Sequence, residues 1–215
     1  MTKKNEIDNL FTLNEVLEAA EKGKYAVGAF SARYIPMILP ILKAGERANS
    51  LLILQISEYE LDRYNIDLSD FAAEFFRILK KEEISIPVVL HLDHTREFKI
   101  IKKAIKENFT SVMIDASSKT YEENTAITKK VVEYAEKHDV SVEAELGQIG
   151  STDTIETEGD EELFTDPGQA QKFVSETGVD ALAVSVGTAH GVYNEVTQPS
   201  VDYERIKAIK KLTPV

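Results

Sequence analysis

The chain has 215 residues, of which 43% are hydrophobic and 29% are charged, a composition typical of a globular protein with one sizeable domain. It contains no cysteine, which excludes disulfides and thiolate metal sites, so any metal must be held by His, Asp and Glu. The formal net charge of −12 argues against nucleic acid and anionic membranes as partners. A small phosphorylated ligand is still compatible with this charge, because backbone amides or a metal ion can bind a phosphate locally.

The N-terminal residues 1–11 are charged and contain no apolar stretch long enough for a signal peptide. No other part of the chain approaches the roughly 18 apolar residues of a membrane span. We therefore expect a cytoplasmic protein that does not enter a membrane.

Six short apolar runs along the chain predict strands. Each run is rich in Val, Ile and Leu and is nearly continuous, a pattern typical of parallel strands that are covered on both faces. The runs comprise residues 25–30, 51–57, 86–93, 110–117, 140–147 and 180–187.

Helices with recognisable ends lie between these runs. Capping boxes of the T-x-x-E type predict helix starts after Thr12 and Thr120, and the pair Asp166-Pro167 predicts a third start. Gly23 and Gly178 predict the ends of the first and third of these helices. The longest irregular segment is acidic and spans residues 150–164, and such long loops are often active-site lids.

The alternation of strands and helices predicts an α/β fold with a parallel sheet, which fits both a doubly wound sheet and a (β/α)8 barrel. No G-x-G-x-x-G pattern follows the first run, which counts against a dinucleotide-binding fold. Polar residues instead end several different runs, at Asp93, Asp115, Glu145 and Gly187, and this distribution favours a (β/α)8 TIM barrel. A barrel has eight units in about 250 residues. We therefore expect residues 1–215 to form a single barrel domain, shortened at its C-terminal end, with about the first six units.

The segment "VVLHLDHTREF", residues 88–98, places three polar side chains at the end of an apolar run. His91 and Asp93 are two residues apart and share one face of a strand, and His94 lies where the strand ends. Solvated polar groups at a strand end are a plain alternative, but two histidines that flank an aspartate favour a metal or acid–base site. His138 follows a predicted helix, where a cationic side chain complements the helix dipole, and we do not expect it to bind a metal.

The fourth histidine, His190, lies in "VSVGTAHGVY", where a predicted strand opens into a loop that contains Gly187 and Gly191. Flanking glycines let backbone amides approach an anion, although a flexible loop with an incidental histidine is the alternative. With Glu145 at the end of another run, three potential metal ligands would converge, namely His94, Glu145 and His190.

Eight segments, taken in order, resemble the class II, zinc-dependent ketose-bisphosphate aldolases, a family that includes the fructose-1,6-bisphosphate and tagatose-1,6-bisphosphate enzymes. The segments are "YAVGAF", "HLDH", "SVMIDAS", "EENTAITKKVVEYA", "SVEAELGQIG", "TDP", "TGVDALAVSVGTAHG" and "VDYERIKAIKK". The resemblance implies a (β/α)8 barrel lyase of carbohydrate metabolism and glycolysis. Such an enzyme cleaves a ketose 1,6-bisphosphate reversibly into dihydroxyacetone phosphate and an aldehyde such as glyceraldehyde 3-phosphate.

The resemblance also implies roles for individual residues. It makes Asp93 the acid/base that handles the proton of the hydroxyl beside the breaking bond. It makes His94 and His190 zinc ligands, and it makes Glu145 an acidic residue near the metal that sometimes ligates it. Gly191 matches a position that lines the phosphate and monovalent-cation site.

Further expectations follow from the same resemblance. Ser57 is expected to bind the substrate or its phosphate. The implied cofactor is Zn²⁺, with K⁺ or Na⁺ as a candidate monovalent cation. The implied partners are a phosphorylated ketose and further copies of the same chain in a dimer or tetramer.

The chemistry of the reaction agrees with a metal route. Retro-aldol cleavage leaves a carbanion, which either a metal ion or a Schiff-base lysine can stabilise. None of the predicted strands has an interior lysine, so the metal is favoured.

Several positions depart from the family pattern. Thr95 stands where glycine usually follows H-L-D-H, and residues 31–34 read S-A-R-Y in place of N-V-N-N. Residues 151–153 read S-T-D where the family often carries glycine and acidic residues. The third zinc histidine and most phosphate-binding loops belong to units that are expected after residue 215. A non-catalytic shortened paralogue or a phosphosugar-binding protein is therefore the alternative function, and the identity of the ketose stays open.

Overall fold

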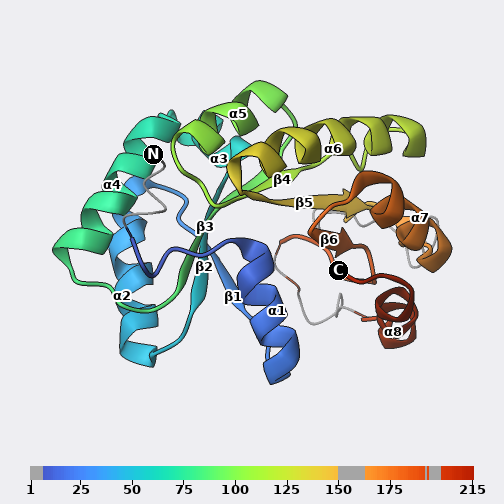
Figure 1. Ribbon diagram of the computed structural model, residues 1–215, viewed down its shortest axis with the longest axis horizontal. Coiled ribbons are helices and arrows are strands. Elements are labelled where there is room, and N and C mark those ends of the chain that lie inside the picture. Colours follow the sequence, from blue (N-terminus) through green and yellow to red (C-terminus); the bar gives the residue numbers. More distant parts are fainter. Residues whose placement is uncertain (1–6, 150–162, 192, 194–199) are drawn as a thin grey trace.

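A single sheet of six parallel strands forms the centre of the computed structural model, which describes residues 7–149, 163–191, 193 and 200–215 (Figure 1). The strands are β1 (Gly28–Ser31), β2 (Leu52–Ser57), β3 (Val88–Thr95), β4 (Ser111–Ile114), β5 (Ser141–Leu146) and β6 (Ala181–Val184). All neighbouring pairs are parallel, and the order in the sheet follows the order in the chain. A doubly wound sheet reverses its order partway, whereas a barrel wall does not. The predicted barrel fold, with six units present, is therefore confirmed.

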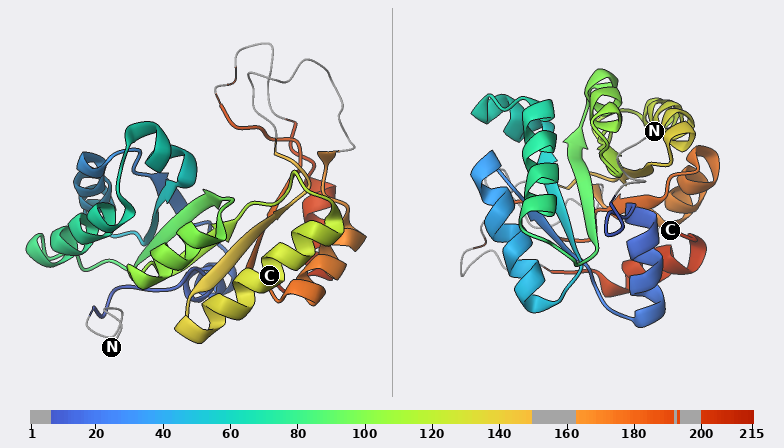
Figure 2. Two further views of the ribbon diagram at one scale, coloured as in Figure 1. Left: turned by 90° about the horizontal axis from the view of Figure 1, so that it is seen from above. Right: turned by 60° about the vertical axis from the view of Figure 1, so that its left-hand side comes forward.

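Each strand is followed by one or two helices, which pack against the outer face of the sheet (Figures 1 and 2). They are α2 (Ile38–Ala48) after the short η2 (Ile35–Met37), α3 (Glu58–Tyr64), α4 (Leu68–Lys81), α5 (Phe98–Lys106), α6 (Tyr121–Ala135) continued by η3 (Glu136–His138), α7 (Pro167–Thr177) and α8 (Tyr203–Leu212). Within the described ranges, none of these helices has the length and apolar character that a membrane span requires.

The helix ends lie where the sequence predicts them. Thr12 and Thr120 form complete capping boxes at the starts of α1 (Leu13–Gly23) and α6. Asp166 caps α7, with Pro167 as its first residue, and Gly178 ends that helix in the left-handed conformation with φ of 70°. Most of the segment that we predicted as a lid, residues 150–162, lies outside the described part of the chain.

The outward-facing side chains of the strands form the main hydrophobic core. Successive residues of a strand point to opposite faces, so alternate positions of each run pack against the helices. These outward positions include Leu54, Leu90 and Val112, which are fully buried together with Phe71 and Phe109 of the helical layer.

The inward-facing positions near the N-terminal ends of the strands are mainly apolar. There Ile53 and Val89 form a second, small cluster with Leu13 and Val16 of α1, so this helix closes that end of the curved sheet. The first and last helices also meet, because Lys210 of α8 forms an ion pair of 3.0 Å with Glu21 of α1 (Figure 2). Further along the strands the inward positions become polar, and the candidate site begins there.

Candidate active site

The inner face of the sheet carries an unusual concentration of polar side chains toward the C-terminal ends of the strands. The strand register places Gln55, His91 and Ser111 at one level, and Ser57 and Asp93 at the level above. Buried polar groups cost free energy unless they are hydrogen-bonded or bind a ligand. This inner face is therefore the natural place for a functional site in a barrel.

The backbone at His94 explains how two consecutive residues both face the site. Regular alternation would send Asp93 and His94 to opposite faces of β3. Instead, the register between β3 and β4 shifts between Leu92 and Thr95, and His94 has a left-handed φ of 38°. Such irregularities re-aim side chains beside active sites, and a non-glycine residue tolerates this strain only when its surroundings enforce it.

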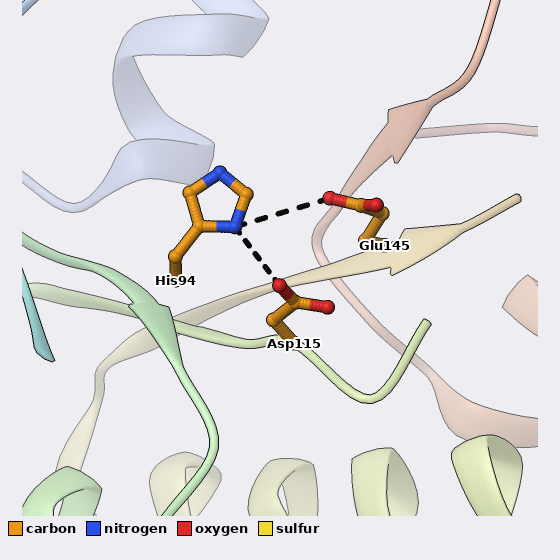
Figure 3. Close-up of side chains that lie close together, drawn as sticks. All are labelled: His94, Asp115 and Glu145. Atoms are coloured by element: carbon orange, nitrogen blue, oxygen red, sulfur yellow. Dashed lines mark hydrogen bonds and ion pairs between the residues drawn. The ribbon is translucent and has the colours of Figure 1, made fainter. Parts of the chain in front are cut away.

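His94 lies beside two carboxylates that come from neighbouring strands (Figure 3). Its Nδ1 atom is 3.0 Å from Asp115 Oδ2 and 3.9 Å from Glu145 Oε2. One ligand atom from each of the three residues lies within 4.8 Å of the others. The His190 ring is also close, with its centroid 5.1 Å from that of His94.

Glu145 provides the observation that points to a cation. Its side chain is buried, and its Oε1 atom accepts a hydrogen bond of 3.1 Å from the Ile149 amide. Its Oε2 atom accepts no hydrogen bond from any described residue. An imidazole and two carboxylates form a suitable ligand set for a divalent metal ion, and an ion would satisfy this oxygen.

The protonation states of His94, Asp115 and Glu145 depend on each other. The hydrogen bond with Asp115 raises the pKa of His94 to about 9, against the opposing effect of burial. Burial favours the neutral form of Asp115, but hydrogen bonds from His94 and Ser117 outweigh it and lower its pKa to about 2. Burial raises the pKa of Glu145. In the metal-free chain a protonated His94 thus supplies positive charge, and a metal ion has to displace that proton on binding.

Asp93 lies next to the group of His94, Asp115 and Glu145, and a side chain of the neighbouring strand β2 donates a hydrogen bond to one of its carboxylate oxygens. Its Oδ2 atom accepts a hydrogen bond of 3.0 Å from Gln55 Nε2, which also donates to Ser31 Oγ at 3.2 Å. Burial raises the pKa of Asp93. A carboxyl with a raised pKa, oriented in a partly open site, is suited to exchanging a proton with a ligand.

The remaining predicted site residues have different surroundings. Ser57 is the N-cap of α3, and its hydroxyl accepts a hydrogen bond of 3.2 Å from the Glu60 amide, so that oxygen is already engaged. Gly191 follows His190 and has a φ of 120°. His138 is exposed at the end of η3, where its Nδ1 atom is 2.9 Å from the Tyr134 carbonyl, and it is not part of the metal-binding group.

Our reasoning from the sequence did not assign Asp115 as a ligand. It identified this residue only as a polar strand end, although β4 lies between the two strands that carry His94 and Glu145. A carboxylate at the end of the intervening strand is the signal that would have identified it.

The fold and the site together define a (β/α) barrel with a histidine–carboxylate centre at the C-terminal ends of its strands. The sequence profile of the family "Fructose-bisphosphate aldolase class-II" matches residues 11–215. The chain therefore belongs to the class II fructose-bisphosphate aldolase family.

Individual relatives agree with this assignment. The chain is 41% identical to the fructose-bisphosphate aldolase of Helicobacter pylori (strain J99) over 94% of its own length and 65% of that protein. It is 39% identical to the probable fructose-bisphosphate aldolase of Bacillus subtilis, over 95% of its own length and 70% of that protein. Thus the chain spans about two thirds of the length of these relatives.

A solved structure shares the fold. The YdjI aldolase from Escherichia coli K12 superposes with a TM-score of 0.82 at 30% sequence identity, over 96% of this chain and 70% of that chain. The family and the fold are shared with these proteins, whereas the activity of this chain is a separate question.

The turn that follows Glu145 requires glycine at position 147, and this requirement can be tested. Gly147 has a φ of 82°, and a Cβ atom there would lie 2.8 Å from the Leu163 carbonyl oxygen and 2.7 Å from Thr165 Oγ1. We predict that Gly147→Ala destabilises the protein by about 2–4 kcal/mol, because left-handed strain adds to the overlap with the backbone. Thermal or urea unfolding measures this loss.

The matched control is Gly168→Ala in α7, where the new Cβ would meet only the Asp166 side chain at 3.2 Å. Its effect should stay within about 1 kcal/mol, because alanine favours the helix. Equal stability of the two variants would show that the turn at Gly147 does not require glycine.

Proposed function

We propose that the chain acts as a class II ketose-bisphosphate aldolase, a lyase that cleaves a ketose 1,6-bisphosphate reversibly. The products are dihydroxyacetone phosphate and an aldehyde, which is glyceraldehyde 3-phosphate when the substrate is fructose 1,6-bisphosphate. The observation that carries the proposal is the group His94, Asp115 and Glu145 beside Asp93, within a family of metal-dependent aldolases.

The proposed cofactor is Zn²⁺, and its proposed ligands are His94, His190 and Glu145, to which the geometry adds Asp115. The Glu145 Oε2 atom, which accepts no hydrogen bond from the described residues, and the lack of cysteine support a site of imidazole and carboxylate ligands. When bound, the ion supplies positive charge that polarises the substrate carbonyl and stabilises the negative charge developed on cleavage.

Asp93 is the proposed acid/base. In the cleavage direction its carboxylate accepts the proton of the C4 hydroxyl of the substrate. The C3–C4 bond then breaks, C4 becomes the aldehyde carbon, and the electron pair stays with C3 of the other fragment. C3 then takes up a proton from solvent to complete dihydroxyacetone phosphate, and Asp93 releases its proton. Gln55 binds Asp93 Oδ2, so Oδ1 is the oxygen proposed to take the proton. In the synthetic direction Asp93 returns that proton to the new hydroxyl.

The alternative aldolase chemistry uses a Schiff-base lysine that projects from a barrel strand. None of the six described strands contains a lysine. This supports the metal route over the covalent one.

Other properties are proposed on the resemblance alone. Gly191 and Ser57 are the proposed contacts of the substrate phosphate, with K⁺ or Na⁺ nearby. A homo-oligomer of two or four subunits and a cytoplasmic location remain predictions. Fructose and tagatose 1,6-bisphosphate are both compatible with the described residues.

We predict that Asp93→Asn lowers kcat for cleavage of fructose 1,6-bisphosphate by roughly 10²–10⁴-fold, because the amide cannot accept the hydroxyl proton. Zinc content should stay unchanged, because Asp93 is not among the proposed ligands. A coupled aldolase assay and metal analysis measure the two effects.

The control is Asp70→Asn, an exposed aspartate on α4, which should behave like the unmodified chain. A near-normal rate for Asp93→Asn would remove its proposed role. Binding of the sugar bisphosphate without cleavage by the unmodified, zinc-loaded chain would instead support a phosphosugar-binding protein.

The mechanism class has its own test. We predict that a metal chelator abolishes cleavage and that added Zn²⁺ restores it, because the developing charge would otherwise be unstabilised. Borohydride added with substrate should trap no covalent adduct, as judged by intact-protein mass spectrometry. An adduct located on a lysine would place the protein in the Schiff-base class.

A further inference from the structure

A second histidine, His91, lies on the inner face one layer below Asp93 and takes no part in the proposed metal site. It is 2% exposed, and its Nδ1 atom is 2.8 Å from Ser111 Oγ. Its Nε2 atom is 3.5 Å from Glu143 Oε2 and 3.9 Å from Asp93 Oδ1. This nitrogen forms no hydrogen bond with any described residue. A buried polar atom between two carboxylates in a site calls for a functional explanation.

The surroundings of the ring select one tautomer. Burial raises the pKa of Glu143 to about 7, so above this pH Glu143 is ionised. If Nδ1 then carried the proton, the lone pair of Nε2 would face two carboxylate oxygens, which is unfavourable in a buried site. If the Ser111 hydroxyl donates to Nδ1, the proton resides on Nε2 and faces both acceptors. Burial lowers the pKa of His91 to about 3, which agrees with a neutral ring.

We propose that His91 is a positioning residue for Asp93. Ser111 fixes the tautomer of the neutral His91 ring, and the ring directs its Nε2–H at Asp93 and Glu143. This holds the two carboxyl groups in a fixed arrangement. The inference rests on the proposed function of Asp93 as the acid/base. Nothing in the resemblance or in the comparisons assigns this role to His91.

The arrangement would hold Asp93 from two sides. Gln55 binds Oδ2 from β2, and His91 approaches Oδ1 from within β3 at 3.9 Å. The 3.5 Å and 3.9 Å separations are longer than formed hydrogen bonds, so in this proposal the Nε2–H attracts both carboxylates electrostatically and is committed to neither. Asp93 can therefore exchange a proton with substrate while its carboxyl plane stays oriented. Precise orientation of this kind contributes mainly to kcat.

Two substitutions separate the two nitrogens of the ring. In His91→Asn the amide reaches the position of Nδ1 and can still meet Ser111, but it cannot reach the carboxylates. In His91→Gln the longer side chain can place an N–H donor near the position of Nε2. We predict that His91→Asn lowers kcat about 10–100-fold with KM changed less than about 3-fold, whereas His91→Gln retains kcat within about 5-fold. Ser111→Ala should give an intermediate loss, because it frees the tautomer without leaving a large cavity.

A merely structural histidine would behave differently. Equal kcat losses in His91→Asn and His91→Gln, in proportion to their losses of melting temperature, would overturn the proposal. If either variant fails to fold, the Ser111→Ala variant decides, and an unchanged kcat there would also overturn it.

A second measurement does not depend on activity. In the metal-free chain labelled with ¹⁵N-histidine, the His91 ring should be neutral with its proton on Nε2 at about pH 8–9, where Glu143 is ionised, and Ser111→Ala should change the tautomer ratio. A proton on Nδ1, or a cationic ring, would contradict the proposal. If the unmodified zinc-loaded chain cleaves no sugar bisphosphate, the proposed function fails, and the nitrogen spectrum still shows whether His91 is directed at the carboxylates.

Discussion

The site depends on how negative charge is accommodated inside the curved sheet. Asp93, Asp115, Glu143 and Glu145 all project into one partly buried volume, where like charges raise each other's free energy. His94 offsets this repulsion through its 3.0 Å contact with Asp115, and Gln55 donates a neutral hydrogen bond to Asp93. Glu145 Oε2 has only the 3.9 Å ion-pair contact with His94 and accepts no hydrogen bond from the described residues, so the compensation by these residues is incomplete. A bound cation would complete the compensation of these negative charges. The stability of the polar inner face and the proposed metal chemistry would then depend on the same ion.

Two backbone features hold the charged layer in place. The register shift at His94 turns that ring toward the carboxylates, and the left-handed turn at Gly147 brings the Ile149 amide back to Glu145 Oε1. Both features lie at the C-terminal ends of strands, where the regular hydrogen bonding of the sheet stops. Below them, α1 and the apolar cluster around Ile53 and Val89 cover the N-terminal ends of the strands, so the polar layer lies on the side of the C-terminal loops.

Much of the fold was predictable because its determinants are local. Near-continuous apolar runs predicted all six strands, and Thr12, Thr120 and Asp166 predicted helix starts that the structure confirms. His94 lies close to both Glu145 and His190. Their positions at strand ends had identified these three residues as potential metal ligands, and the resemblance added their specific roles at a zinc ion. The distortion at His94, the contribution of Asp115 and the environment of His91 depend on the alignment of neighbouring strands. A single sequence does not specify that register, so these features became visible only in three dimensions.

The central proposal is that His94, His190 and Glu145, together with Asp115, hold a divalent metal ion. Its most direct test is calorimetric titration of the metal-free chain with Zn²⁺, compared with Asp115→Asn, Glu145→Gln and the exposed control His138→Ala. The account predicts one site per chain, an affinity reduced roughly 10–100-fold or more in the two carboxylate variants, and no change in the control. Equal affinity in all four proteins, or the same loss in His138→Ala as in Glu145→Gln, would contradict it.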